Sequence, residues 1–356
     1  MNNRYRKQRN YGCRIHDSLT YSGMKTLVLE NERIRITLLL DKGAEVVEFL
    51  YKPKDLDFVW LTENGIQNPT DYLPTSSDPI SSFIDYYPGG WQEVFPNGGP
   101  TSSSLGAQFG QHGEVAHMPW DYEIVEDKPE KITVRLTVMP RKIPVRLTRT
   151  LTLLSDNSSL FEEEELENLS DVSLPYMWGQ HLAFGKPFLG EGATINLPEG
   201  ISVMTDDTDL AADQRARVRR GEIYQWPWVD DLQGGKFDLS IVPPAETPSE
   251  MIYLTGFPNV GWYQLENRKL NMGIKVEWDA ERLPYLWYWQ EFGATKSYPW
   301  YGRHYNIGLE PFSSYPTQGL HKAVANGSAG MLDGYEIQTF FMNITPYLME
   351  SFIDQT

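Results

Sequence analysis

The groups in this chain that could exchange protons at neutral pH are a carboxylate, Glu310, and two of its six histidines, His112 and His181. Glu310 ends the run Ile307-Gly-Leu-Glu and precedes Pro311, while both histidines lie in glycine-rich segments without a regular apolar period, where functional residues often collect. Carboxyl groups titrate at about pH 4 and imidazoles at about pH 6.5. Together they form a base and an acid that could take one proton from a neutral substrate and return another.

Other common reaction centres match the sequence poorly. His112, Glu114 and His117 resemble a metal-ligand cluster, but the five-residue step between the histidines does not place both imidazoles on one helix face. The pairs Gly89-Gly90 and Gly98-Gly99 lack the lysine and the strand–helix context of a phosphate-binding loop. A serine nucleophile would need a Gly-x-Ser-x-Gly elbow, which the chain lacks. We therefore expect no catalytic metal and no cofactor.

Aromatic residues precede the carboxylate in two short apolar runs that flank a turn-rich loop; these residues are Trp287, Trp289, Trp300 and Tyr301. Flat rings with polar edges beside an acid suit a neutral, hydroxyl-rich ligand. The same pattern is typical of a strand that ends over an aromatic core, because Pro311 has no N–H and is expected to stop sheet pairing after Glu310. The sequence leaves both interpretations open.

The elements that must position these groups are predicted to be strands, because short runs with β-branched residues partly alternate in polarity. The predicted strands are Lys25–Glu30, Ile34–Leu40, Ala44–Tyr51, Lys131–Val138, Val145–Leu154, Leu160–Asn168, Phe237–Val242, Ile252–Thr255, Trp262–Glu266, Met272–Glu277 and Tyr335–Ile344. Two long stretches, Thr62–Gly110 and Trp178–Gly192, show no period and are expected to be irregular. The run Glu162–Glu165 is interpreted as a solvated or edge-protecting face. Asp206–Arg220 could hold a short helix.

Since almost no segment has a helical period, we predict an all-β protein of many antiparallel strands with few short helices. One large sandwich domain over residues 21–356 is expected to follow an N-terminal arm of residues 1–20. The length of 356 residues is compatible with a single β domain of this kind.

Charge and composition narrow the class of partner. The net charge of −17 repels nucleic acid and anionic membrane surfaces but does not disfavour a neutral ligand. The single cysteine, Cys13, fits a reducing compartment, and the polar, basic segment Met1–Asn10 is not a secretory signal peptide. No apolar run approaches the length of a membrane span. We expect a cytoplasmic monomer or homodimer with no nucleic-acid or membrane partner.

Four motifs occur in a characteristic order. They are Gly89-Gly-Trp-Gln-Glu-Val-Phe-Pro96 with Asn97-Gly-Gly, His112-Gly-Glu-Val-Ala-His-Met-Pro-Trp120, Gln180-His181-Leu-Ala-Phe184, and Ile307-Gly-Leu-Glu310-Pro311. In this order they resemble motifs of the galactose mutarotase-like, or aldose 1-epimerase, superfamily. The resemblance extends from about Leu27 to Ile344, and the order of the motifs is more specific than any one of them.

The resemblance implies a β-supersandwich with a sugar-binding cleft on one face. In that superfamily a glutamate takes the proton from the anomeric hydroxyl and a histidine protonates the ring oxygen. Carried over by position, Glu310 would be the base and His181 the acid, while His112 would bind near the ring oxygen or a hydroxyl. The candidate substrate-binding residues are Trp91, Glu93, Asn97, Trp120, Trp178 and Gln180.

The sequence departs from the superfamily pattern at two positions. Leu182 follows His181 where proline is common, and Ala116 stands where the hexose-phosphate branch carries an arginine. The second departure argues against a phosphosugar, although Arg141, Arg146 or Arg149 could substitute. The aspartate that binds sugar hydroxyls in the galactose branch has two candidates, Asp230 and Asp231.

Three functions are therefore weighed. The first is an isomerase that interconverts the α and β anomers of a small-molecule sugar by acid–base ring opening. The alternative is a non-catalytic carbohydrate-binding protein on the same fold, because a fold does not determine a function. The third is glycoside cleavage, which needs a second carboxylate beside Glu310; Glu93, Glu114 and Glu291 are the candidates.

Overall fold

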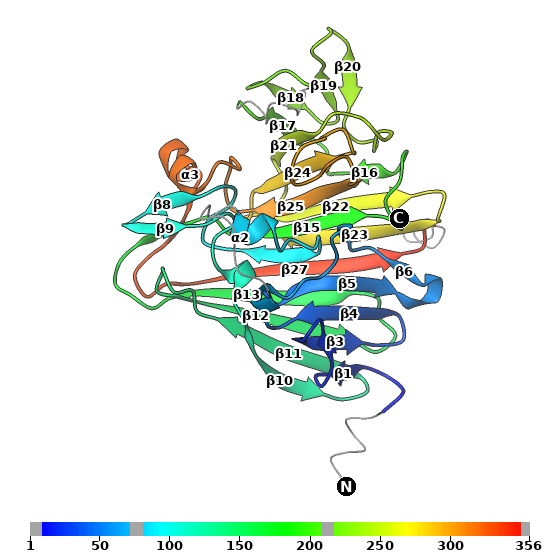
Figure 1. The fold of residues 1–356 in the computed structure, drawn as a ribbon, viewed down its shortest axis with the longest axis vertical. Helices are drawn as coiled ribbons and strands as arrows, with labels where there is room; N and C mark the ends of the chain where they lie inside the picture. The colour runs from blue at the N-terminus through cyan, green and yellow to red at the C-terminus, as the bar shows by residue number, and fades with distance from the viewer. Residues whose placement is uncertain (1–8, 72–80, 208–216, 350–356) are drawn as a thin grey trace.

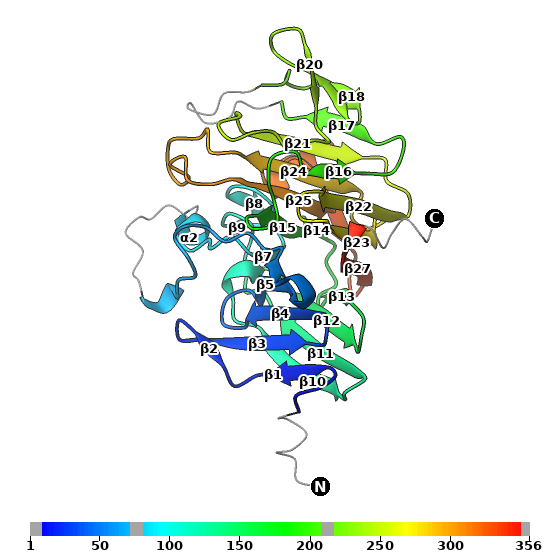
Figure 2. The same ribbon diagram turned by 90° about the vertical axis from the view of Figure 1, so that its right-hand side faces the viewer.

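The structure is a computed structural model that describes residues 9–71, 81–207 and 217–349. Strands in this part of the chain form two large antiparallel sheets that pack face to face (Figures 1 and 2). The prediction of an all-β fold with few short helices is confirmed. No helix in the described ranges is both long and apolar enough to cross a membrane.

The larger sheet has 13 strands and carries the candidate site near its middle. Its order along the main path is β1 (Arg14–His16), β3 (Met24–Glu30), β4 (Ile34–Leu39), β5 (Glu45–Tyr51), β7 (Trp91–Val94), β15 (Gly179–Gly185), β25 (Asn306–Phe312), β24 (Tyr285–Glu291), β21 (Glu250–Thr255), β17 (Ser202–Thr205) and β18 (Ile223–Gln225). Beside this path, β2 (Thr20–Tyr21) pairs with β3 and β6 (Leu56–Asp57) pairs with β5.

The second sheet has eight strands. Its order is β10 (Asp121–Asp127), β11 (Lys131–Val138), β12 (Val145–Leu154), β13 (Leu160–Asn168), β27 (Ile337–Tyr347), β23 (Met272–Asp279), β22 (Val260–Asn267) and β16 (Thr194–Asn196). In β12 the apolar residues alternate with polar ones that face outward, as a strand with one buried face requires. Apolar side chains from both sheets form one continuous core between them.

Shorter elements complete the described fold. Three two-stranded sheets pair β8 (Ser102–Ser104) with β9 (Ala107–Phe109), β14 (Leu174–Tyr176) with β26 (Gly330–Leu332), and β19 (Trp228–Asp230) with β20 (Lys236–Asp238). The helices are α2 (Ser81–Ile84), α3 (Leu320–Asn326) and the 3-10 turns η1 (Lys52–Lys54), η2 (Pro69–Asp71) and η3 (Val115–His117). The β19–β20 pair lies at the end of the molecule farthest from β1 (Figures 1 and 2).

Most predicted strands match observed ones within two or three residues, but both stretches expected to be irregular contain strands. Trp178–Gly192 includes β15, in which every residue is buried, and Thr62–Gly110 includes β7. A strand buried on both faces has no alternation of polarity, so the periodicity test could not detect either one. Similarly, the predicted strand Phe237–Val242 is reduced to the short β20.

The N-terminal arm and the run of glutamates also differ from what the sequence predicted. Arg14–His16 of the predicted arm pairs with β3, so this part of it belongs to the larger sheet. Glu162–Glu165 is not an edge, because β13 lies between β12 and β27; Glu162 and Glu164 are buried. Most of the suggested helix in Asp206–Arg220 lies outside the described residues.

Pro311 does not end its strand, which was a wrong prediction. It lies inside β25 opposite Leu286 of β24, and the ladder to β24 is continuous. On the other side, pairing between β15 and β25 is interrupted between the pairs Gly179–Phe312 and Ala183–Gly308. The missing N–H of proline fits this interruption. Glu310 therefore lies within the sheet, at a gap in its ladder.

Candidate functional site

A pocket of about 260 Å³ opens over this gap in the larger sheet. The three residues predicted to be catalytic, His112, His181 and Glu310, all line it. The other lining residues are Phe83, Ile84, Tyr87, Gly99, Pro100, Gln111, Met251, Trp287, Trp289, Trp300 and Thr317. Their segments are distant in sequence, and the order of the sheet brings them together.

Glu310 and His181 face each other across neighbouring strands. The register that pairs Gly179 with Phe312 and Ala183 with Gly308 places His181 of β15 opposite Glu310 of β25. The His181 Nε2 atom lies 3.5 Å from Glu310 Oε1. This contact is not an aligned hydrogen bond, because Glu310 Oε1 has no hydrogen-bond partner in the described part of the chain. The two groups are close enough to act on one small substrate.

Gly308 makes room for the Glu310 carboxylate. Both residues lie on the same face of β25, because side chains alternate along a strand. A Cβ atom added at Gly308 would lie 2.1 Å from Glu310 Oε1, well inside van der Waals contact. Glycine at this position therefore allows the carboxylate to lie over the backbone of its own strand, towards His181.

His112 is held in an unusual backbone conformation beside the other two groups. Its φ angle of 57° is in the left-handed region, which few non-glycine residues adopt. Its Nδ1 atom accepts a hydrogen bond of 3.3 Å from the backbone N–H of Gly99. The rings of His112 and His181 are 5.4 Å apart between centroids. Because Nδ1 accepts, a neutral His112 carries its proton on Nε2 and can donate from that atom.

Burial sets the protonation of the three groups. It raises the pKa of Glu310 well above its usual value, because the charged carboxylate loses its hydration. Burial lowers the pKa of His181 to about 4 and that of His112 well below the usual value, because it disfavours the charged imidazolium. Electrostatic repulsion from His181 lowers the pKa of His112 further. Burial thus favours the uncharged form of each of the three groups.

Aromatic rings also line the pocket, among them three of the four aromatic residues that the sequence singled out. Trp287, Trp289 and Trp300 line the pocket, and the rings of Trp289 and Trp300 are 5.4 Å apart. Tyr301 is 57% exposed and does not line it. Tyr87, which the sequence did not single out, contacts His181 ring to ring at 5.6 Å.

None of the six predicted substrate-binding residues is among the residues that line the pocket. In the core, Trp91 Nε1 donates to the Ala183 carbonyl, and Trp120 Nε1 donates to the Val115 carbonyl. Asn97 binds the backbone of neighbouring loops through both its amide and its carbonyl oxygen. These side chains support the fold around the site.

Glu93, Trp178 and Gln180 lie on the opposite face of the sheet from His181. Consecutive strand residues point to opposite faces, so Gln180 faces the core when His181 faces the pocket. Glu93 accepts hydrogen bonds from Trp178 Nε1 and from Gln180 Nε2, the latter at 2.7 Å. Trp178 and Gln180 are close to His181 in the sequence, yet neither lines the pocket.

Behind this face lies a buried acidic cluster of Glu93, Glu162 and Glu164, with carboxylate oxygens within 4.8 Å of one another. Three carboxylates could hold a metal ion, but Arg149 already supplies a cation, through hydrogen bonds to Glu162. Burial, the largest cause, raises the pKa of Glu93 to about 7 and that of Glu164 well above its usual value. The Arg149 guanidinium group therefore offsets part of the negative charge of the cluster, and burial favours protonation of Glu93 and Glu164.

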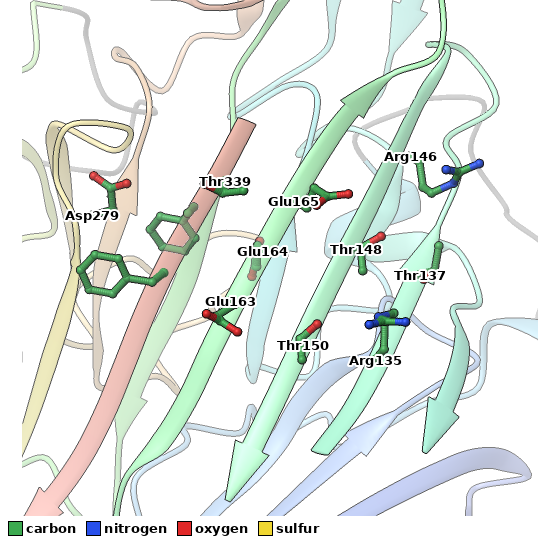
Figure 3. Close-up of a pocket in the computed structure, with 12 residues that line it drawn as sticks. Arg135, Thr137, Arg146, Thr148, Thr150, Glu163, Glu164, Glu165, Asp279 and Thr339 are labelled. Carbon is green, nitrogen blue, oxygen red and sulfur yellow. The ribbon is translucent and has the colours of Figure 1, made fainter. Parts of the chain in front are cut away.

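The proposed substitutes for a phosphate-binding arginine do not reach the pocket. Arg149 is buried between the sheets, and Arg146 forms an ion pair with Glu167 on the outer face of the eight-stranded sheet. Figure 3 shows Arg146 in a second hollow, of about 780 Å³, on that outer face. This hollow is lined by threonine, arginine and glutamate residues of β11, β12 and β13 together with Asp279, Thr339, Phe340 and Phe341, and it shares no lining residue with the pocket of the catalytic candidates.

The two candidate aspartates are also misplaced for substrate binding. Asp231 Oδ1 accepts hydrogen bonds from the backbone of Gln233 and Gly235 in its own turn, and Asp230 ends β19. The buried aspartate connected to the pocket is Asp206, through Tyr253 to Thr317. No local sequence pattern marks Asp206, because its partners are distant in the chain.

Comparison with solved structures defines the class of the fold. A protein from Klebsiella pneumoniae described as a "putative aldose 1-epimerase" superposes with a TM-score of 0.74 at 16% identity, over 99% of this chain and 88% of that chain. A galactose mutarotase-like protein from Lactobacillus casei gives a TM-score of 0.61 at 15% identity, over 90% and 100% of the two chains. The fold is therefore galactose mutarotase-like, as the motif order predicted.

The family is given by a match of residues 21–220 to the family described as "Domain of unknown function (DUF4432)". The match covers more than half of the chain, and the protein belongs to this family. No curated protein matches the chain.

Proposed function

We propose that this protein is an aldose 1-epimerase-type isomerase that interconverts the α and β anomers of an uncharged sugar, with Glu310 as base and His181 as acid. The supporting observation is the 3.5 Å contact between these two groups in a pocket with aromatic walls. Fold neighbours described as putative aldose 1-epimerases agree with this class of reaction.

Ring opening requires two coupled proton transfers. The Glu310 carboxylate takes the proton of the anomeric hydroxyl, and His181 gives a proton to the ring oxygen as the bond between that oxygen and the anomeric carbon breaks. The resulting aldehyde turns, and the reverse transfers close the ring on its other face. The pair holds one exchangeable proton before and after the reaction, so no other co-reactant is needed.

The raised pKa of Glu310 and the lowered pKa of His181 are compatible with these roles. A proton that passes from Glu310 to His181 converts the neutral pair into the carboxylate–imidazolium pair with the same proton count. A bound sugar that donates its anomeric hydroxyl to Glu310 stabilises the carboxylate. A base with a raised pKa also accepts a proton more strongly once it is ionised.

The substrate class follows from the charges of the lining. In the described part of the chain no lysine or arginine lines the pocket, and Glu310 is its one carboxylate. A phosphate, carboxylate or sulfonate on the substrate would be buried without a cation, at a large cost in desolvation. An aldose without charged groups avoids this cost, while its apolar ring face can stack on Trp289 or Trp300.

Glycoside cleavage is not favoured by this geometry, because it needs two carboxyl groups that flank the scissile bond. Glu93 faces the core, and Glu114 accepts a hydrogen bond from the backbone of Lys142. Glu291 accepts hydrogen bonds from Ser249 and Thr295. None of these three carboxylates lines the pocket with Glu310.

The test is anomer exchange, measured by NMR on a panel of free aldoses with Glu310→Gln, His181→Asn and the control Glu114→Gln. We expect the first two substitutions to reduce the exchange rate by about a hundredfold or more, and the control to leave it unchanged. Exchange that persists in Glu310→Gln within a few-fold of the wild-type rate would contradict the proposed base. Sugar binding without exchange in the wild type would instead favour a carbohydrate-binding protein.

A further inference from the structure

One wall of the pocket is built from three loops that Asn97 ties together. Asn97 Nδ2 donates to the carbonyls of Pro100 and Gly110 at 2.8 and 2.9 Å, and its Oδ1 accepts from the Leu320 N–H at 2.8 Å. These bonds hold the loop of Gly99, the loop that precedes His112 and the loop that follows Thr317. The wall therefore presents His112 and Thr317 to the pocket as fixed groups.

A chain of hydrogen bonds reaches Thr317 from behind this wall. The Tyr253 hydroxyl lies 2.6 Å from Asp206 Oδ2 and 2.8 Å from Thr317 Oγ1, and it accepts a third bond of 3.0 Å from the Thr317 N–H. Asp206 and Tyr253 are 4% and 2% exposed. The chain is thus shielded from bulk water up to Thr317, which is half-buried.

The donor and acceptor roles in this chain follow from the one proton that each hydroxyl group carries. The Tyr253 hydroxyl donates its single proton to Asp206 Oδ2, and the same carboxyl group accepts from Gln318 Nε2 at 2.9 and 3.1 Å. Tyr253 must then act as acceptor towards Thr317, and the Thr317 hydroxyl proton points at Tyr253. Only the lone pairs of Thr317 Oγ1 are left for a ligand.

We propose that Thr317 is a specificity-determining residue that accepts a hydrogen bond from one hydroxyl group of the sugar, and that Asp206 and Tyr253 fix it in this acceptor role. This inference rests on the proposed function and names the contact by which the site selects a hydroxylated substrate. His112 complements it, because its Nε2–H can only donate when Nδ1 accepts from Gly99. The wall then offers one donor and one acceptor to neighbouring oxygens of the sugar.

The test compares three forms of the substrate: the parent aldose, deoxy analogues that lack one hydroxyl, and fluoro analogues in which fluorine replaces it. Fluorine accepts weakly but cannot donate, so a site that only accepts should reject both analogues. Binding and anomer exchange are measured for the wild type, Thr317→Val, Thr317→Ser and Tyr253→Phe. Thermal unfolding of each variant shows whether it is folded.

At one ring position we expect the wild type to bind both analogues about tenfold more weakly than the parent, the cost of one lost hydrogen bond. Thr317→Val should lose this discrimination and Thr317→Ser should keep it. Tyr253→Phe removes the acceptor that holds the Thr317 proton, so the fluoro analogue should recover several-fold relative to the deoxy analogue. A structural role for Tyr253 would not change that ratio.

The outcomes separate this inference from the proposed function. If the wild type exchanges anomers but Thr317→Val discriminates at every position as the wild type does, the role of Thr317 is wrong and the isomerase proposal stands. If Tyr253→Phe folds and leaves the ratio of fluoro to deoxy binding unchanged, the relay is wrong. If no aldose binds or exchanges, both proposals are overturned.

Discussion

Replacement of Gly308 by alanine should abolish most of the activity without unfolding the protein. The added methyl group would lie 2.1 Å from Glu310 Oε1. To restore ordinary contact at 3.4 Å or more, the carboxylate must move by about 1.3 Å. A displacement of about 1 Å in a catalytic group can cost about a hundredfold in rate. The backbone tolerates alanine, because Gly308 does not have a positive φ angle and strand positions accept any L-residue.

The assay is the rate of anomer exchange by NMR, with thermal unfolding in parallel. Gly190→Ala is the matched control, since its added methyl group would meet only Asn267 Nδ2, at 3.7 Å, and its φ angle is not positive. We expect a loss of about a hundredfold in Gly308→Ala, little change in Gly190→Ala, and no further loss when Gly308→Ala is added to Glu310→Gln. If Gly308→Ala retains activity within threefold of wild type, the position of the carboxylate does not control the rate.

Further predictions concern pH and the buried charges. Exchange activity should fall near pH 4, where His181 gains a proton and the pair holds two, and again above the raised pKa of Glu310, where it holds none. The pKa of His181 is about 4 in the folded protein and about 6.5 in the unfolded chain, so the unfolded chain binds more protons between these two pH values. The free energy of unfolding, measured by urea titration, should therefore fall as the pH drops through this range. His181→Asn should make this fall less steep. Arg149→Met should lower the free energy of unfolding by about 3–5 kcal/mol, because it leaves Glu162 buried without its cation. The Arg146 side chain is 44% exposed, whereas that of Arg149 is 4% exposed, so Arg146→Met should lower the free energy of unfolding by less than about 1 kcal/mol. Equal losses in the two variants would show that burial of the ion pair is not decisive.

Local sequence patterns predicted strand bounds well where one face of a strand is buried and the other is exposed to solvent. The strands β11, β12 and β13 were predicted with their observed bounds. Polar and apolar residues alternate throughout β11 and along much of β12, whereas in β13 burial alternates although Glu162–Glu165 are all acidic. The same rule failed for β15, whose seven residues are all buried, and for Pro311, which the gap in the ladder accommodates. The meaning of Glu162–Glu165 changed for a related reason: alternate glutamates point into the sandwich, where Arg149 meets them.

By itself the sequence determined the all-β class, and it singled out His112, His181 and Glu310, which the structure brings into one pocket. Only the tertiary structure decided which neighbouring residues reach the pocket. Gln180 and His181 are adjacent in the chain, yet side-chain alternation sends one to the core and the other to the site. Thr317, Tyr253 and Asp206 come together across more than 100 residues, which no local pattern records. The three central residues of the candidate site could therefore be chosen from the sequence, whereas the other residues that line its pocket depend on strand register and long-range packing.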